Sequence, residues 1–168
     1  MKYFMISTIF FILAQAHASD FTSRGNPLKA EPPIEFQQRL IPKISKENIQ
    51  STDKRERTMG HYAAQAGYDL LLEAIIEKAK SHGFLKQLMD KQDSDGDTML
   101  HKAVLSGQME VVELLLTYGA ETSVENKFNL TPSLLAKNLN LTDIEQRIKT
   151  KELVGEIMKG MERIELTD

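Results

Sequence analysis

The 168-residue chain contains no cysteine, so it can form neither a disulfide framework nor a thiol nucleophile or thiolate metal site. It also lacks a basic excess, because 21 lysine and arginine residues stand against 24 acidic ones. Proteins that bind nucleic acids or anionic membranes normally carry such an excess. No glycine-rich phosphate-binding loop occurs. These absences argue against nucleic-acid binding, thiol chemistry and nucleotide-phosphate binding.

The N-terminus has the pattern of a secretory signal peptide. Lys2 is followed by an apolar run over residues 3–14 and then by Ala16-His17-Ala18, with small residues at the two positions that signal peptidase reads. We predict a signal peptide over residues 1–18, a mature chain over residues 19–168, and an exported protein, periplasmic or secreted. Without disulfides, an exported domain fits a bacterial periplasm or export route best. The alternative is an uncleaved membrane anchor, although the run is shorter than the roughly 20 residues that cross a bilayer.

The densest pattern extends over residues 93–121. A turn with Gly96 leads into Thr98-Met99-Leu100-His101, a short helix-forming run ends at Gly107, and a second apolar run closes at Gly119-Ala120. This segment resembles an ankyrin repeat, a unit of about 33 residues with the signature T-P-L-H-x-A. Met99 stands in place of the usual proline. The resemblance implies an all-α solenoid in which stacked helix-turn-helix units bury each other's apolar faces.

Weaker copies of the pattern flank this unit. Thr131-Pro132 follows Thr98 by one period, and Thr58-x-x-His61 precedes the corresponding residues of the central unit. The sequence therefore predicts about three units, at residues 53–92, 93–125 and 126–150. The first unit is longer than the norm by about seven residues, and we place this insertion around residues 80–86.

The segments outside the repeats are expected to serve the ends of the stack. Residues 19–52 hold four of the five prolines and are predicted to be mostly flexible, with one short helix over residues 33–40 that shields the first repeat. Residues 151–168 are predicted to form a C-terminal capping helix and tail, since solenoid ends need a polar-backed cap. The helix carries an apolar stripe of Leu153, Ile157, Met158 and Met161. The alternative interpretation of this stripe is a docking helix for a partner.

The residues that could carry chemistry are better explained by structure. The resemblance implies that His61 and His101 bond to the backbone of an adjacent turn and to Thr58 and Thr98, three residues earlier. Asp93-x-Asp95-x-Asp97 is similar to the start of an EF-hand loop, but Thr98 and Val104 occupy the positions that need Gly and Glu. We therefore predict no catalytic residue, no metal site and no cofactor.

The remaining candidate is a protein-binding surface. In ankyrin repeats, partners commonly meet the turn tips and the exposed face of the inner helices. Thr131 is the third structural threonine of the motif, after Thr58 and Thr98. Carried over by position, the residues expected to meet a partner are Lys54, Arg55, Arg57, Tyr62, Asp95, Asp97, Lys102, Leu105, Lys127, Phe128 and Leu130. We predict a non-catalytic adaptor that binds another protein. The alternatives are an inhibitor or immunity-type protein for one cognate enzyme or toxin, and a small ligand-binding or enzymatic protein that uses the inserted Ser81-His82-Gly83.

Overall fold

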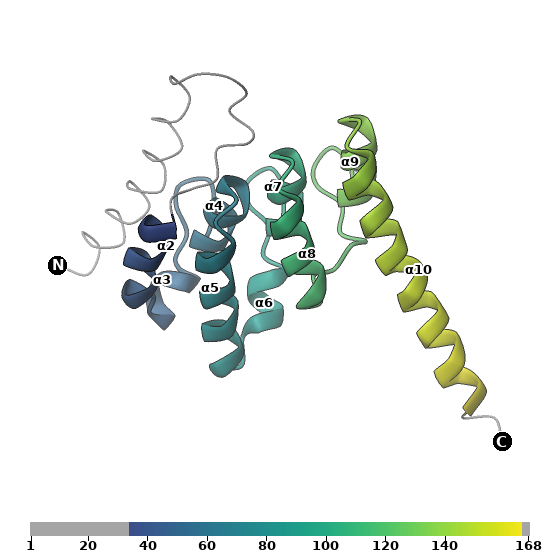
Figure 1. Ribbon diagram of the computed structural model, residues 1–168, viewed down its shortest axis with the longest axis horizontal. Coiled ribbons are helices and arrows are strands. Elements are labelled where there is room, and N and C mark those ends of the chain that lie inside the picture. The colour runs from purple at the N-terminus through teal and green to yellow at the C-terminus, as the bar shows by residue number, and fades with distance from the viewer. Residues whose placement is uncertain (1–33, 166–168) are drawn as a thin grey trace.

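The described part of the protein is an all-α solenoid, as the sequence predicts. Its computed structural model describes residues 34–165, and this part of the chain contains helices and no strand. The helices stack side by side from α2 to α10 (Figure 1). The predicted signal peptide, residues 19–33 and residues 166–168 lie outside the described residues. The helices are α2 Ile34–Leu40, the 3-10 helix η3 Ile41–Lys43, α3 Lys46–Gln50, α4 Met59–Ala66, α5 Asp69–Ser81, α6 Leu85–Met89, α7 Met99–Leu105, α8 Met109–Thr117, α9 Pro132–Asn138 and α10 Thr142–Glu165.

The first helices cover the N-terminal end of the repeat stack. α2 packs against α5, and α3 packs against α4 and α5. Gln37 of α2 is buried, and its Oε1 accepts a hydrogen bond from the backbone N–H of Leu71 at 3.1 Å. This N–H lies in the first turn of α5, where no intrahelical carbonyl is available to it. The short helix predicted before the repeats is therefore present, and it caps α5 as well as shielding it.

The insertion in the first repeat forms a helix of its own. α5 ends at Ser81, Gly83 adopts a left-handed backbone with φ of 75°, and α6 follows from Leu85. Leu88 and Met89 of α6 are buried in the common core. The extra residues thus fall where the sequence places them, and they add apolar burial rather than a disordered loop.

The core between repeats combines small inner helices with bulky outer ones. Ala63, Ala64 and Ala103 on α4 and α7 are fully buried, which lets these two inner helices pack closely. The outer helices contribute large side chains to the same core: Leu71, Leu72, Ile75, Ile76, Val111, Val112, Leu115 and Leu116. Burial of each such side chain stabilises the fold by roughly 1.5–3 kcal/mol.

The third repeat ends in one long helix, so the predicted boundary between residues 150 and 151 is wrong. α10 runs without interruption from Thr142 to Glu165. In the second repeat, Gly119 with φ of 84° follows the end of α8. The corresponding residue one period later is Glu152, which has no such tendency to leave the helix. The outer helix of the third repeat therefore continues beyond the stack.

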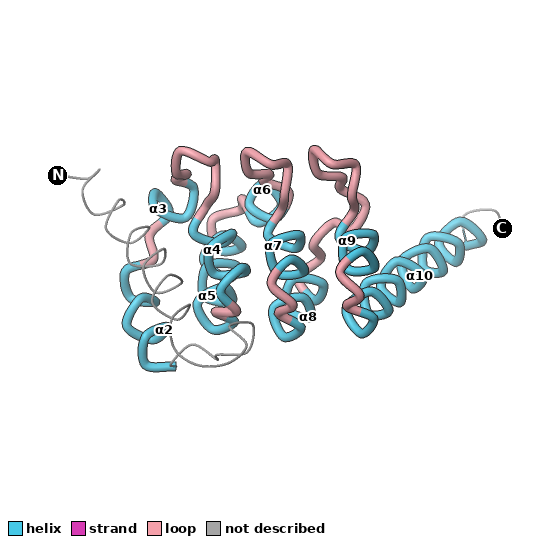
Figure 2. Tube along the Cα trace, turned by 90° about the horizontal axis from the view of Figure 1, so that it is seen from above, coloured by secondary structure: helices cyan, strands magenta, loops and turns pink. Residues whose placement is uncertain are grey.

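The predicted capping role of residues 151–168 is also corrected. The described part of this segment leaves the stack, as both views of the molecule show (Figures 1 and 2), and its apolar side chains from Leu153 to Met161 are exposed. Instead, the face of the third repeat itself is polar. Val104, Val112 and Leu116 are fully buried in the second repeat, and one period later their places are taken by Lys137, Glu145 and Lys149. The end of the stack is therefore closed by charged residues on α9 and α10.

Among the helices of residues 34–165, none combines the length and the apolar character required to cross a membrane.

Candidate protein-binding surface

The tips of the three repeats are built as the same turn. Each begins with an Asp or Asn, at Asp53, Asp93 and Asn126, whose side-chain oxygen accepts the N–H groups of the second and fourth residues after it at 2.8–3.1 Å. The third residue after the Asp or Asn has a positive φ in each tip: Glu56, Gly96 and Asn129. An Asx side chain that accepts backbone bonds and a residue that tolerates the left-handed region are the local requirements of this turn. The sequence thus builds three equivalent tips.

Backbone hydrogen bonds join each tip to the next. The N–H of Ser94 donates to the carbonyl of Arg55 at 2.8 Å, and the N–H of Lys127 donates to the carbonyl of Asp95 at 3.0 Å. Figure 2 shows the three tips side by side along one edge of the molecule. The backbone positions that carry their exposed side chains are consequently fixed relative to one another.

The two motif histidines tie each repeat to the following tip. Nδ1 of His61 accepts the N–H of Thr58 at 3.2 Å, so the proton of the neutral ring lies on Nε2, which donates to the carbonyl of Asp97 at 3.1 Å. His101 repeats the arrangement with Thr98 and with the carbonyl of Leu130 at 3.0 Å. Burial lowers the pKa of His61 to about 4 and also lowers the pKa of His101. Both rings therefore serve as structural hydrogen-bonding groups. Thr131 caps α9 in the third repeat, where its Oγ1 accepts the N–H of Leu134 at 3.3 Å.

The first tip carries a compact charged and aromatic corner. Arg57 pairs with Asp53 at 2.9 Å and lies over the ring of Tyr62, 4.4 Å from its centroid. The Tyr62 hydroxyl donates to Asp53 at 2.6 Å, and burial together with this bond raises the pKa of Tyr62 to about 12. Burial alone would raise the pKa of Asp53, but the hydrogen bonds from Tyr62 and from backbone amides outweigh it, and the pKa is lowered. Arg57 and Tyr62 thus present only part of their surface, in a fixed geometry.

The second tip contains a buried ion-paired cluster, which corrects the expectation for Asp97 and Lys102. Both were predicted to face a partner, but both are buried. The Lys102 Nζ lies 2.8 Å from Asp93 Oδ2 and 2.8 Å from Asp97 Oδ2, and Asn126 Nδ2 donates to Asp97 Oδ1 at 2.8 Å. Burial opposes the charge on Lys102 and on Asp93, but their mutual bonds prevail: the pKa of Lys102 is raised and that of Asp93 is lowered. The cluster fixes the tip to α7 and to the next tip.

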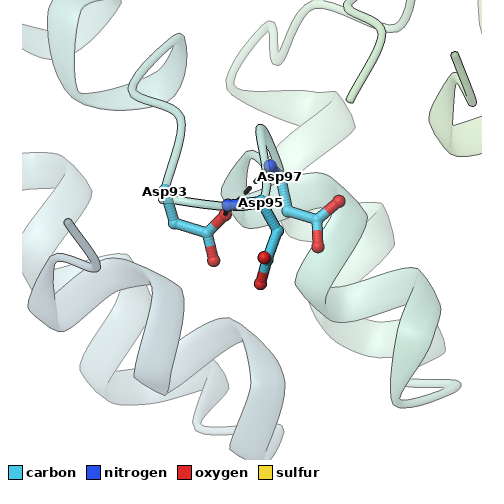
Figure 3. A group of neighbouring side chains, drawn as sticks. All are labelled: Asp93, Asp95 and Asp97. Atoms are coloured by element: carbon cyan, nitrogen blue, oxygen red, sulfur yellow. Dashed lines mark hydrogen bonds between the residues drawn. The ribbon is translucent and has the colours of Figure 1, made fainter. Parts of the chain in front are cut away.

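The same cluster contains two of the three neighbouring carboxylates of this turn. Asp93, Asp95 and Asp97 lie on one turn before α7 (Figure 3), and each can place one oxygen within 4.8 Å of the others. The ammonium group of Lys102 is ion-paired with two of them, Asp93 and Asp97. Asp95 is the exposed member of the group.

The structure leaves a smaller surface than the sequence predicts. Of the predicted contact residues, Lys54, Arg55, Asp95, Leu105, Lys127 and Phe128 are exposed. Leu130 is partly buried against the core. Phe128 is 68% exposed and Leu105 is 42% exposed. The exposed set is therefore basic at the first tip, acidic at the second, and basic and aromatic at the third.

Sequence reasoning missed one exposed apolar residue of the inner helices, Leu134. It occupies the position of His101 one period later, where no further tip is present within the described residues, and it is 45% exposed. The replacement of the motif histidine by leucine was visible in the sequence. Its exposure could be inferred only from the position of α9 at the end of the stack.

The sequence model of the ankyrin-repeat family, described as ankyrin repeats in three copies, matches residues 32–126, more than half of the chain. The geometry and this match together define an ankyrin-repeat protein, and ankyrin repeats are generally protein–protein interaction modules. The chain belongs to the ankyrin-repeat family.

Curated proteins match over part of the chain. An L-asparaginase of Dirofilaria immitis is 41% identical over 66 residues, covering 39% of this chain and 11% of that protein. The human ankyrin repeat domain-containing protein 29 is 50% identical over 44 residues, covering 26% of this chain and 15% of its own length. The regulatory protein SWI6 of Kluyveromyces lactis is 30% identical over 110 residues, covering 50% of this chain and 14% of its own length. The chain thus spans less than a sixth of each of these relatives.

Proposed function

We propose that this protein is a non-catalytic, exported adaptor that binds another protein through its tips and inner-helix face. Ankyrin repeats are generally protein–protein interaction modules, and this chain has their architecture. The observation that carries the proposal is the set of backbone hydrogen bonds that joins the three tips, which we call the tip ladder. It holds Arg55, Asp95 and Phe128 on one edge without any of them being needed to fill the core.

Phe128 is the expected anchor of the contact. Its side chain is the most exposed large apolar group of residues 34–161, and its backbone N–H, rather than its ring, serves the turn by donating to Asn126. Exposed aromatic residues flanked by charge are typical of interface hot spots, because a ring buries much area at little entropic cost. The opposite charges of the first two tips would orient the partner and speed its association.

A comparative capture experiment tests the proposal. The mature chain, residues 19–168, is immobilised and exposed separately to periplasmic extract of the producing cell and to host-cell lysate. The matched bait carries Phe128→Ala and Asp95→Lys, which alter the edge and leave the core intact. A protein retained by the wild type and lost with the variant supports the proposal. If both baits retain the same proteins, this edge is not the binding surface.

Export is tested independently. Amino-terminal sequencing of the protein from the producing cell should begin at Ser19. Recovery of intact Met1 in the membrane fraction would instead support an uncleaved anchor.

A further inference from the structure

The tip ladder ends in a main-chain acceptor that no described residue uses. At both junctions of the ladder, the carbonyl of the second residue after the Asp or Asn accepts an N–H of the next tip, and these carbonyls belong to Arg55 and Asp95. Phe128 holds the same position in the third tip. Within the described part of the chain, nothing donates to its carbonyl. Because the three tips are built as the same turn, the Phe128 carbonyl is directed beyond the end of the ladder.

The place beside the third tip can receive another segment of main chain. A Cβ added to Gly96 would lie 2.8 Å from the backbone nitrogen of Lys127, so these successive tips lie in direct contact. Asn129 corresponds to Gly96 in the third tip and is exposed, with φ of 56°. The first tip has Glu56 at this position, and its ladder bond from Ser94 still forms. A side chain here is therefore compatible with a further main-chain bond.

Two side chains of α9 face the same end of the stack. On α7, His101 and Val104 are fully buried, and His101 bonds to the third repeat at the Leu130 carbonyl. One period later, Leu134 and Lys137 take their places on α9, where no described repeat follows. Leu134 is 45% exposed, and Lys137 is exposed as well. The end of the stack therefore offers an open carbonyl, an apolar side chain and a cation.

The charge at this end favours an acidic segment. Lys127 and Lys137 form no ion pair with any side chain that the structure describes, whereas Lys149 at the same end is paired with Glu145. The unpaired charge is therefore positive. A carboxylate brought to this end is attracted, and a basic group is repelled.

A second copy of this chain is a poor match for the site. To continue the ladder it would offer the N–H of Lys54, which is the first tip's counterpart of Ser94 and Lys127. The exposed side chains of Lys54 and Arg55 would then approach Lys127. Like charges at a contact select against such a pairing. The occupant that the charges favour is a segment of another protein.

We propose that the partner of the adaptor binds through an acidic segment that extends the tip ladder at its C-terminal end. A backbone N–H of the segment donates to the Phe128 carbonyl, an apolar side chain covers Leu134, and a carboxylate pairs with Lys137. The main-chain bond contributes affinity, and the two side-chain contacts select the sequence, as where other open main-chain edges receive a peptide. This inference rests on the proposed function and adds the chemistry of the partner and the place where it docks.

Peptide selection tests the docking site with a defined probe. The mature chain is presented to a phage-displayed library of random linear peptides, and the affinities of the enriched sequences are measured with synthetic peptides. We expect these sequences to carry Asp or Glu close to an apolar residue. Leu134→Glu and Lys137→Glu should each raise the dissociation constant at least about tenfold, since each places a negative charge against the acidic segment. The proposal is overturned if no sequence is enriched, or if the enriched peptides bind both variants as well as the wild type.

The matched control is Leu105→Glu. Leu105 is 42% exposed, close to the value for Leu134, but it lies on α7 away from the end of the stack. This substitution should change the peptide affinity by less than about twofold.

The main-chain bond is tested on the selected peptides themselves. Each peptide bond is replaced in turn by an ester, which removes the N–H donor and keeps the side chain. Replacement at one position should weaken binding about tenfold, because the Phe128 carbonyl then loses its donor. A scan in which every ester analogue binds like the parent peptide would show that the ladder is not continued.

The results also separate this inference from the proposed function. Peptide binding that depends on Asp95 or Leu105, with Leu134 and Lys137 indifferent, would leave the adaptor function standing and overturn the docking site. Self-association of the chain that Leu134→Glu abolishes would place a second copy at the site and overturn the assignment to another protein. Conversely, acidic peptides that bind as expected, while the capture experiment yields no partner, would support the site and count against the exported adaptor.

Discussion

The Nε2 atom of His61 lies 3.1 Å from the carbonyl oxygen of Asp97, so a ring on the first repeat holds the tip of the second. The bond crosses the interface between two repeats and joins residues 36 positions apart. Solenoid stability depends on such nearest-neighbour interfaces. The protonation state of His61 is therefore linked to the stability of the stack.

We predict that the free energy of unfolding falls as the pH drops from about 6.5 to about 4. In this window the unfolded chain protonates His61, whereas in the folded protein burial lowers the pKa of His61 to about 4 and the ring stays neutral. The unfolded state then binds more protons, and about 3 kcal/mol is lost by the lower end of the window. Urea unfolding at a series of pH values measures the slope. His61→Gln should flatten it, and the exposed His82→Gln is the control. An unchanged slope in His61→Gln would contradict the assignment.

Asp93 of the second tip contributes to stability in a different pH range. Because the pKa of Asp93 is lowered in the folded protein, its contribution is present above its ordinary value of 3.8 and is lost as the pH falls below it. The losses due to His61 and Asp93 are thus separable along the pH axis.

Replacement of Lys102 by methionine should strongly lower the free energy of unfolding. It would leave Asp93 and Asp97 buried without their counter-charge, which typically costs about 3–5 kcal/mol. The control is Asp95→Asn on the same turn, where the exposed side chain predicts a change within about 0.5 kcal/mol. Chemical denaturation of both variants gives the comparison. Similar small losses in both would mean that the ion-paired cluster contributes little.

Alanine substitutions at two glycines with nearly equal φ angles can distinguish the cost of backbone strain from the cost of a steric clash. Gly96 and Gly83 have φ of +78° and +75°, so alanine at either position costs roughly 1–2 kcal/mol of backbone strain. A Cβ on Gly96 would also lie 2.8 Å from the backbone nitrogen of Lys127, whereas a Cβ on Gly83 would meet nothing within 4 Å. We expect Gly96→Ala to lose a further 1–3 kcal/mol or so, since the tip ladder must shift. Thermal unfolding of the two variants tests this prediction. Equal losses of stability in Gly96→Ala and Gly83→Ala would show that the tips are not held closely together.

Phe128→Ala and Asp95→Lys should leave melting almost unchanged, because both residues are exposed. Once a partner protein is identified, Phe128→Ala should weaken its binding by about 2 kcal/mol or more, mainly through faster dissociation. Asp95→Lys should mainly slow association and alter its salt dependence. Surface plasmon resonance at two ionic strengths distinguishes these effects. A large loss of stability in Phe128→Ala would assign the ring to the core instead.

The sequence predicted the repeats because their key contacts are local. Thr98 and His101 are three residues apart, and the tip turns depend on an Asx residue and a left-handed position within five residues. The insertion at residues 80–86 followed from counting residues between His61 and His101. Such features need no knowledge of how distant segments meet.

The orientation of Asp97 could not be predicted in this way. Its carboxylate turns inward because Lys102 on α7 and Asn126 on the next tip both reach it. Neither contact is implied by the position of Asp97 within its own turn. A lysine at an inner-helix position, with two aspartates shortly before it, was the available signal for a buried pair. The length of α10 was likewise not predicted. The helix continues because Glu152 stands where the second repeat has the helix-ending Gly119.

The uninterrupted backbone of α10 makes residue number a measure of angle and reach. From Thr150 to Glu165 the helix extends about 22 Å, and each residue turns the helix by about 100°. Inserting a single residue between Thr150 and Leu153 would leave the repeats and the stripe individually intact but swing one relative to the other by more than a quarter turn. A change in chain length here keeps the relative orientation of the repeats and the stripe only in steps that restore the helical phase, whereas a flexible linker would impose no such requirement.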